Sequence, residues 1–175
     1  MSEHPDLSGL IERDHEQIEL RFAQYEGGMT AASYDEIVSA VVEGLTRHAT
    51  AEEQVVYPVV GDVLGDEEAE RSLAEHARIT ELLRRIHRAD HDTDTTHDFT
   101  ELMAEVRHHV PPEEQELLPR LRRELGDERM AELGAAFARA KADAPSAPPG
   151  HTVAGTVASV VHRVSDAISN KGRDR

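Results

Sequence analysis

The segment HATAEEQVVYP, residues 48–58, returns 61 residues later as HVPPEEQELLP, residues 109–119. Each copy begins with a His, has a Glu four residues later, and continues with a second Glu, a Gln and a Pro in the same places. The same offset relates His15 to His76 and maps most apolar positions of the two halves onto each other. The chain is therefore predicted to contain two copies of one helical hairpin, packed about a pseudo-two-fold axis.

Four long stretches around these segments carry apolar residues at helical spacing. We expect helices at residues 7–25, 34–60, 67–89 and 99–125, with short breaks such as Gly61 to Gly65 between them. None of the stretches alternates with the period of a strand. Amphipathic helices with short connections predict an all-α fold, an antiparallel up-down four-helix bundle over residues 1–125.

The chain beyond the bundle has a looser pattern. Residues 126–143 are expected to form an extra, mostly polar C-terminal helix whose docking face would be Met130, Leu133 and Phe137. Residues 144–175 are a Pro-rich linker and an amphipathic tail. This tail is rich in β-branched residues, so it is predicted to be disordered or to form a helix that is weakly docked or mediates oligomer formation.

Composition excludes several classes of function. The 175 residues include 35 Asp and Glu against 19 Lys and Arg, a net charge of −16, and no Cys. Without Cys there is no disulfide, thiolate metal site or iron–sulfur cluster. The negative charge argues against binding to nucleic acid or to an anionic membrane. No apolar run could span a bilayer and no signal-peptide pattern is present, so a cytoplasmic location is expected.

Six polar side chains interrupt the apolar stripes of the expected helices, and they are His15, His48, Glu52, His76, His109 and Glu113. A buried Glu is costly without a partner, and two facing Glu are worse unless a positive charge lies between them. Residues four apart share one face of a helix, so each His-x-x-x-Glu can aim at one point. Four imidazoles and two bridging carboxylates are enough for two metal ions, with positions left for an oxo or hydroxo bridge, water or a small diatomic molecule.

This pattern, one His followed by His-x-x-x-Glu and then repeated, resembles the hemerythrin-like family of HHE cation-binding domains over residues 7–121. The resemblance implies a four-helix bundle around a non-haem centre of two Fe ions bridged by two carboxylates. Oxygen-carrying hemerythrins have a fifth His where this chain has Thr80. The two metals are therefore expected to be more nearly equivalent, and the resemblance favours bacterial hemerythrin-like proteins, some of which are associated with peroxide or nitric oxide chemistry.

Two features leave alternatives for the ligand set. Pro111 and Pro112 should bend their helix, and a widened turn would present His108 in place of His109. Tyr57 is either a packed ring or, if Pro58 distorts its turn, an extra ligand.

Other carboxylates near the ligands are also candidates. Glu19, one turn after His15, is a candidate additional ligand. Four further acids are candidates to accept the outer N–H of a ligating His, namely Asp14, Glu53, Glu75 and Glu114.

Three functions follow from such a centre. The first is a di-iron protein that binds or senses O2, NO or H2O2, with a role in oxidative or nitrosative stress. The second is a di-iron oxidoreductase that consumes peroxide or nitric oxide, with catalase- or peroxidase-like activity, and the third is metal storage. Imidazole and carboxylate also suit zinc and manganese. A Tyr57 ligand would favour oxidising chemistry, and no catalytic residue or protein partner is assigned.

Overall fold

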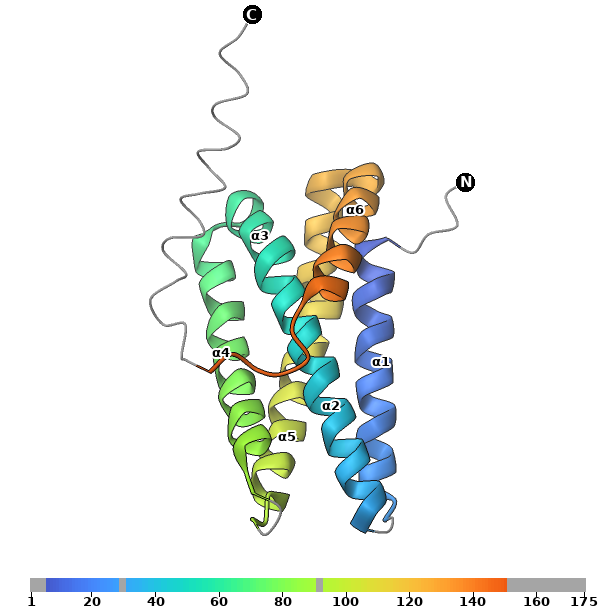
Figure 1. Cartoon of the computed structure of the whole chain (residues 1–175). Coiled ribbons are helices and arrows are strands. Elements are labelled where there is room, and N and C mark those ends of the chain that lie inside the picture. The colour runs from blue at the N-terminus through green and yellow to red at the C-terminus, as the bar shows by residue number, and fades with distance from the viewer. Residues whose placement is uncertain (1–5, 29–30, 91–92, 151–175) are drawn as a thin grey trace, which may run out of the picture.

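The computed structural model describes residues 6–28, 31–90 and 93–150, and all regular structure within these ranges is helical. The elements are α1 (Leu7–Glu26), α2 (Ala31–Ala51), η1 (Glu52–Val56), α3 (Tyr57–Leu64), α4 (Asp66–Arg88), α5 (Thr96–Pro112), η2 (Glu113–Leu117) and α6 (Leu118–Asp143). The π-helical turns η1 and η2 join α2 to α3 and α5 to α6, so that four long helices pack as a bundle (Figure 1). This confirms the predicted all-α four-helix bundle.

The helix ends follow local chemistry. Asp6 caps α1 by accepting a hydrogen bond of 3.1 Å from the backbone N–H of Gly9. The helix containing α3 continues to Leu64, so the break expected from Gly61 onward begins only at Gly65. Gly65 has a φ of 105°, a conformation that a residue without a Cβ adopts at little cost.

The π-helical turns are the main departure from regular helix geometry. The N–H of Tyr57 donates to the carbonyl of Glu52, and the N–H of Leu118 donates to that of Glu113, each five residues back. One extra residue per turn rotates the side chains that follow. Val60 is consequently buried in the core, whereas Val59, expected on the core stripe, is only partly buried.

The turn η1 has no proline before it, yet it matches η2, which directly follows Pro112. The irregularity expected from Pro111 and Pro112 therefore belongs to both copies of the repeat and does not depend on these prolines. π-Helical turns inside α-helices are frequent at functional sites.

The apolar core is divided into two clusters. One cluster packs around Phe22, Leu83 and Phe99, and the other around Ile11 and Leu121. Along α1, His15 lies between the residues of these clusters, which places a buried polar layer between two apolar ones.

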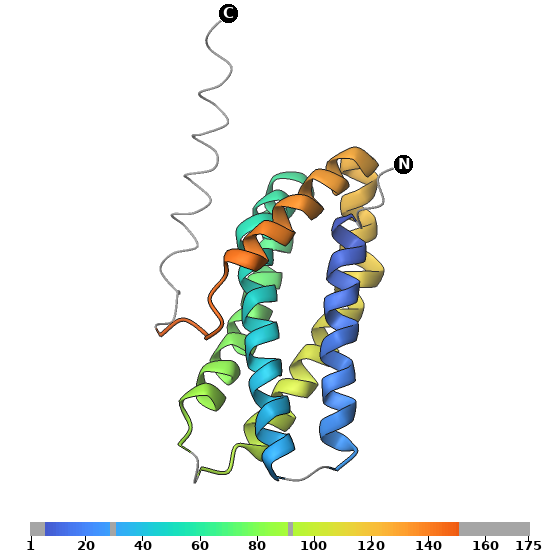
Figure 2. The same ribbon diagram turned by 45° about the vertical axis from the view of Figure 1, so that its right-hand side comes forward.

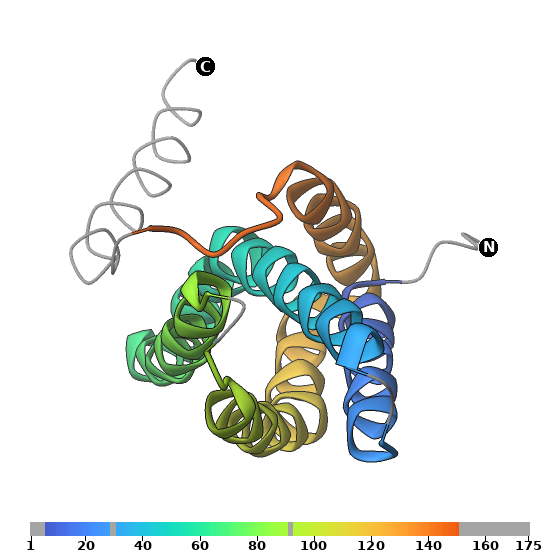
Figure 3. The same ribbon diagram turned by 60° about the horizontal axis from the view of Figure 1, so that its bottom comes forward.

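The second part of α6 folds back onto the bundle. Gly126 leaves the helical conformation, with φ 77° and ψ 166°, and the residues after it cross the face formed by α1 and α2 (Figures 2 and 3). Met130, Leu133 and Phe137 are buried there, as their spacing predicted. A Cβ at Gly134 would lie 2.8 Å from the backbone N of Leu7, so the helices approach closely at this point.

The described helices include none that is both long and apolar enough to cross a bilayer. The C-terminal tail expected from the sequence, residues 151–175, lies outside the described residues.

Candidate metal centre

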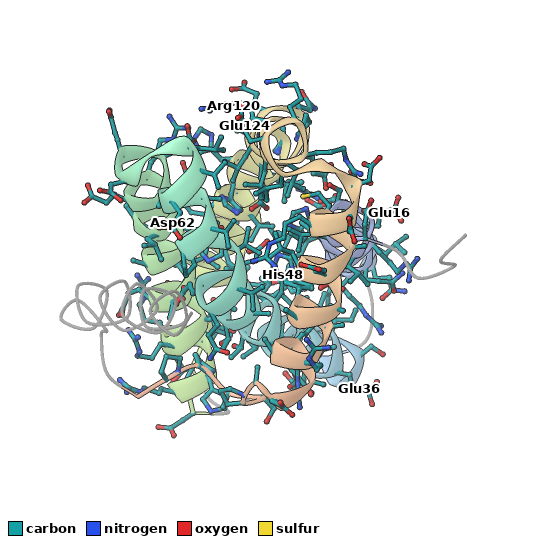
Figure 4. All side chains as sticks on the ribbon, turned by 90° about the horizontal axis from the view of Figure 1, so that it is seen from above. Glu16, Glu36, His48, Asp62, Arg120 and Glu124 are labelled. Atoms are coloured by element: carbon teal, nitrogen blue, oxygen red, sulfur yellow. The ribbon has the colours of Figure 1, made fainter. Side chains whose placement is uncertain are left out.

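The structure brings the six predicted ligands together inside the bundle. Each of the four long helices supplies one His, and the first residues of η1 and η2 supply the two Glu. All six are buried, with exposed fractions of 0% for Glu52 and 2% for Glu113. Figure 4 shows His48 in the interior, whereas Glu16 and Glu36 lie at the periphery.

The four imidazoles form two pairs. The Nε2 atoms of His15 and His48 are 3.1 Å apart, and those of His76 and His109 are 3.2 Å apart. Two nitrogens bound to one ion at about 2.1 Å and about 90° to each other would be about 3 Å apart. Each pair therefore has the spacing of two ligands on a single metal ion.

The two carboxylates lie between these pairs. Glu52 has one oxygen 3.2 Å from Nε2 of His48 and the other 3.2 Å from Nε2 of His76. Oε2 of Glu113 is 3.5 Å from Nε2 of both His15 and His109. Each Glu thus faces both imidazole pairs, which is the arrangement that a bridging carboxylate requires.

Both carboxylates hold buried oxygens without a hydrogen-bond partner among the described residues. These atoms are both oxygens of Glu52 and Oε2 of Glu113. Leaving such atoms unpaired is expensive in a dry interior. Two groups of ligand atoms, His15, His48, Glu52 and Glu113 in one and Glu52, His76 and His109 in the other, each lie within 4.8 Å of one another. The residues present therefore fit a pair of bound cations.

The outer nitrogen of each imidazole faces a carboxylate. Nδ1 of His15 is 2.7 Å from Glu114, Nδ1 of His48 is 3.1 Å from Asp14, and Nδ1 of His109 is 2.7 Å from Glu75. Nδ1 of His76 is 3.5 Å from Glu53, too far for a good hydrogen bond. These are the four acids predicted for this role, and such partners fix the orientation of a ligating imidazole.

Tyr57 lies inside the centre. Its hydroxyl is 2.7 Å from Nε2 of His76 and 3.5 Å from Oε1 of Glu113, and its ring is 1% exposed. A regular α-helix would have directed this ring away from the ligands, and η1 turns it inward. Its repeat partner is Leu118, so only one half of the centre has this hydroxyl.

Sequence comparison agrees with this geometry. Residues 6–121 match the hemerythrin HHE cation binding domain. The chain belongs to this family.

Two other proteins are similar in sequence to this hemerythrin-like chain. An uncharacterized hemerythrin-like protein of Schizosaccharomyces pombe is 29% identical over 93% of this chain and 86% of its own length. A protein of Nostoc named as a DNA nickase is 26% identical over 78% of this chain but only 39% of its own length. No solved structure matches the sequence.

The two remaining candidate ligands lie away from the centre of this hemerythrin domain. His108 is exposed, whereas its neighbour His109 is buried. The carboxylate of Glu19 pairs with Arg107 at 2.6 Å on the surface.

Burial and charge shift the pKa values of the centre's groups. Burial beside His48 lowers the pKa of His15 to about 4. Burial opposes the charging of His48, but the carboxylates of Glu52 and Asp14 outweigh it and raise its pKa to about 10. Burial also opposes the charging of His76, but the carboxylates of Glu52 and Glu53 outweigh it and raise the pKa of His76 to about 9. Burial, together with the nearby carboxylates, raises the pKa of the Tyr57 hydroxyl well above its usual value.

Proposed function

We propose that this chain is a non-haem di-iron protein whose centre reacts with hydrogen peroxide, dioxygen or nitric oxide. The observation that carries the proposal is the pair of buried carboxylates, each facing both imidazole pairs and holding unpaired oxygens. One ion would be held by His15 and His48 and the other by His76 and His109, with Glu52 and Glu113 shared.

Iron is the metal that best suits this proposal. Imidazole and carboxylate also accept zinc and manganese, and affinity alone does not choose among them. Two adjacent ions, each with about four protein ligands, leave positions open for a small molecule. Bound iron would supply ferrous–ferric redox chemistry and a Lewis-acid position for that molecule.

Residues around the proposed ligands orient the imidazoles and separate the centre from bulk water. The outer carboxylates Asp14, Glu75 and Glu114 orient three of the imidazoles through hydrogen bonds. The two apolar clusters on either side exclude bulk water from the polar layer. The absence of an imidazole at Thr80 favours a centre of the bacterial hemerythrin-like type over a specialised oxygen carrier.

Tyr57 favours consumption of peroxide over reversible binding of dioxygen. A phenolate oxygen stabilises ferric iron, and the hydroxyl lies among the ligand atoms, 2.7 Å from Nε2 of His76. Catalase-like dismutation, in which two H2O2 give two H2O and one O2, needs no external reductant. Reversible binding or sensing of O2 or NO is the second candidate, because the two His pairs are closely similar in spacing.

Metal analysis and optical spectroscopy test the proposal. Protein expressed in iron-replete medium should contain about two irons per chain, by analogy with related di-iron bundles. The double variant His48→Ala/His109→Ala should lose them, and retained iron would end the proposal. The reduced protein is then mixed separately with O2, H2O2 and NO. Rapid peroxide turnover supports the enzyme, and a stable reversible adduct supports the sensor.

A further inference from the structure

One side of the centre opens into a cavity of about 280 Å³. His109 and Glu113 reach this cavity from the centre, and its other walls include Glu68, Arg71, Ser72 and Glu116. Glu113 is 2% exposed, and its Oε2 is one of the buried oxygens without a partner. The cavity, which we call the α4–α5 groove, therefore extends from the surface to the side chains of His109 and Glu113, two of the predicted ligands.

The internal repeat identifies the surface of the first half that is equivalent to the groove of the second half. At the 61-residue offset, the positions of Glu68, Arg71, Ser72 and Glu116 correspond to Leu7, Leu10, Ile11 and Val55. These four residues belong to or pack against the apolar cluster that contains Met130, Leu133 and Phe137 of α6. A polar groove in one half thus replaces an apolar docking face in the other.

The second part of α6 seals that apolar face. The ring of Phe137 packs edge-on against the ring of His48, with centroids 5.8 Å apart, and Lys141 pairs with Asp14 behind the same imidazole. The equivalent pair in the second half, His109 and Glu75, instead borders the groove.

The charged walls of the groove are unsuited to covering by an apolar helix. Glu68 pairs with Arg71 and also, at 2.8 Å, with Arg120. Removing such groups from water would cost more than their attraction returns. The groove is consequently a polar passage, and its walls carry carboxylates, the Arg71 guanidinium and the Ser72 hydroxyl, which can exchange hydrogen bonds with a small polar molecule.

We propose that small polar molecules reach the centre through the α4–α5 groove, beside His109, and that hydrogen peroxide is the substrate class that this route selects. This inference rests on the proposed di-iron function. Hydrogen peroxide both donates and accepts hydrogen bonds, so it suits walls that carry carboxylates, a guanidinium and a hydroxyl. An apolar diatomic molecule gains nothing from them and can also diffuse through packed side chains.

The test fills the groove with bulky side chains, because the smaller apolar residues of the first half are closed only by the covering α6 helix. The triple variant is Arg71→Trp/Ser72→Ile/Glu116→Trp, and the double variant without Ser72→Ile guards against misfolding. Glu36→Trp/Arg139→Trp makes the same change in charge and size at exposed positions outside the groove lining.

Cobalt uptake by the metal-free proteins measures access independently of activity. The visible absorption of bound Co²⁺ should develop at least about tenfold more slowly in the closed variants than in the wild type and the control. An equal rate in all proteins would overturn the inference. If the wild type itself binds no Co²⁺, the proposed metal centre fails instead.

The iron-loaded proteins test the selectivity. Closing the groove should slow the optical change on mixing with peroxide by at least about tenfold, and slow nitric oxide binding by less than about threefold. Equal slowing of both reactions would overturn the preference for a polar substrate. A wild type that reacts with neither molecule would refute the proposed function, not the route.

Discussion

The two hairpins of this bundle share a ligand pattern, the acids next to it and a π-helical turn, but they differ in what covers the centre. In the first half, the second part of α6 covers His48 with Phe137. In the second half, His109 borders an open polar groove. Tyr57 has only Leu118 as its repeat partner. The ligands alone would make two nearly equivalent metals, so the surroundings are what distinguish the two sides of the centre.

The largest effect is expected from breaking what both halves share. Glu52→Gln keeps the shape of the side chain but removes the charge that faces both imidazole pairs. We expect iron content to fall from about two per chain to below about one, because the bridging charge is lost. Metal analysis of the purified protein measures this.

Glu53→Gln is the matched control for this variant. Its side chain is 40% exposed and lies 3.5 Å from the outer nitrogen of His76. It should keep most of the iron. If the two variants lost iron equally, Glu52 would have no bridging role.

The helices and the clustering of the six buried His and Glu side chains were predictable because both follow from periodic spacing in the sequence. His48 and Glu52 share a helical face, the 61-residue offset repeats them, and charged residues on an apolar stripe stand out. The four outer acids were also predictable, since they immediately precede or follow ligands.

The position of Tyr57 and the existence of the groove were not predictable in the same way. The inward turn of Tyr57 depends on one extra residue in η1, which a regular 3.6-residue period does not contain. The sequence carries no clear signal for this turn, because Val59 and Val60 are both apolar and only the structure shows that Val60 is the buried one. The groove depends on which face α6 covers after Gly126, and that is a matter of tertiary packing.

Removing the contact between α6 and the first half should have a smaller effect than removing a shared carboxylate of the centre. Phe137→Ala removes a fully buried ring from the contact with His48, and we expect a loss of about 3–5 kcal/mol in the free energy of unfolding. Urea denaturation of the metal-free protein measures it. Arg139→Ala, on the exposed side of the same helix, should change the stability by less than about 0.5 kcal/mol. A loss below about 1 kcal/mol for Phe137→Ala would show that α6 does not seal this half.

The metal-free protein should lose stability at high pH. His48 and His76 have folded-state pKa values of about 10 and about 9, above the usual value of 6.5. Their stabilising contribution is therefore fully present below about pH 6.5 and is lost as the pH rises through 9 to 10. Thermal unfolding between pH 6 and 10 measures this loss.

Metal binding provides the complementary measurement. A metal must displace the protons of His48 and His76, so loading at pH 7 should release protons into a weakly buffered indicator solution. His15, with a pKa of about 4, contributes none. Loading without proton release would contradict these charge states.

Tyr57→Phe sharpens the difference between the halves with little change in packing. If the hydroxyl contacts bound ferric iron, the visible tyrosinate-to-iron absorption should disappear in the variant, and peroxide turnover should fall. Leu118→Phe adds a ring without a hydroxyl at the repeat-equivalent position and should leave that absorption intact. An identical spectrum in wild type and Tyr57→Phe would remove Tyr57 from the ligand set.

The smallest effect is expected at Lys141, which pairs with Asp14 behind His48 and has no counterpart behind His109 among the residues that the structure describes. The ammonium lies at a partly exposed position, so Lys141→Met should cost at most about 1 kcal/mol of stability. Its loss leaves Asp14 as a stronger acceptor for His48, because one of the two groups that lower the pKa of this carboxyl is gone. If the two halves are distinguished by their surroundings, the optical spectrum of the iron-loaded variant should shift slightly while Glu75→Gln, on the other side, produces a different shift. The same shift from both variants would mean that the centre responds equally to changes in the two halves. The asymmetry of the bundle would then not affect the bound metal ions.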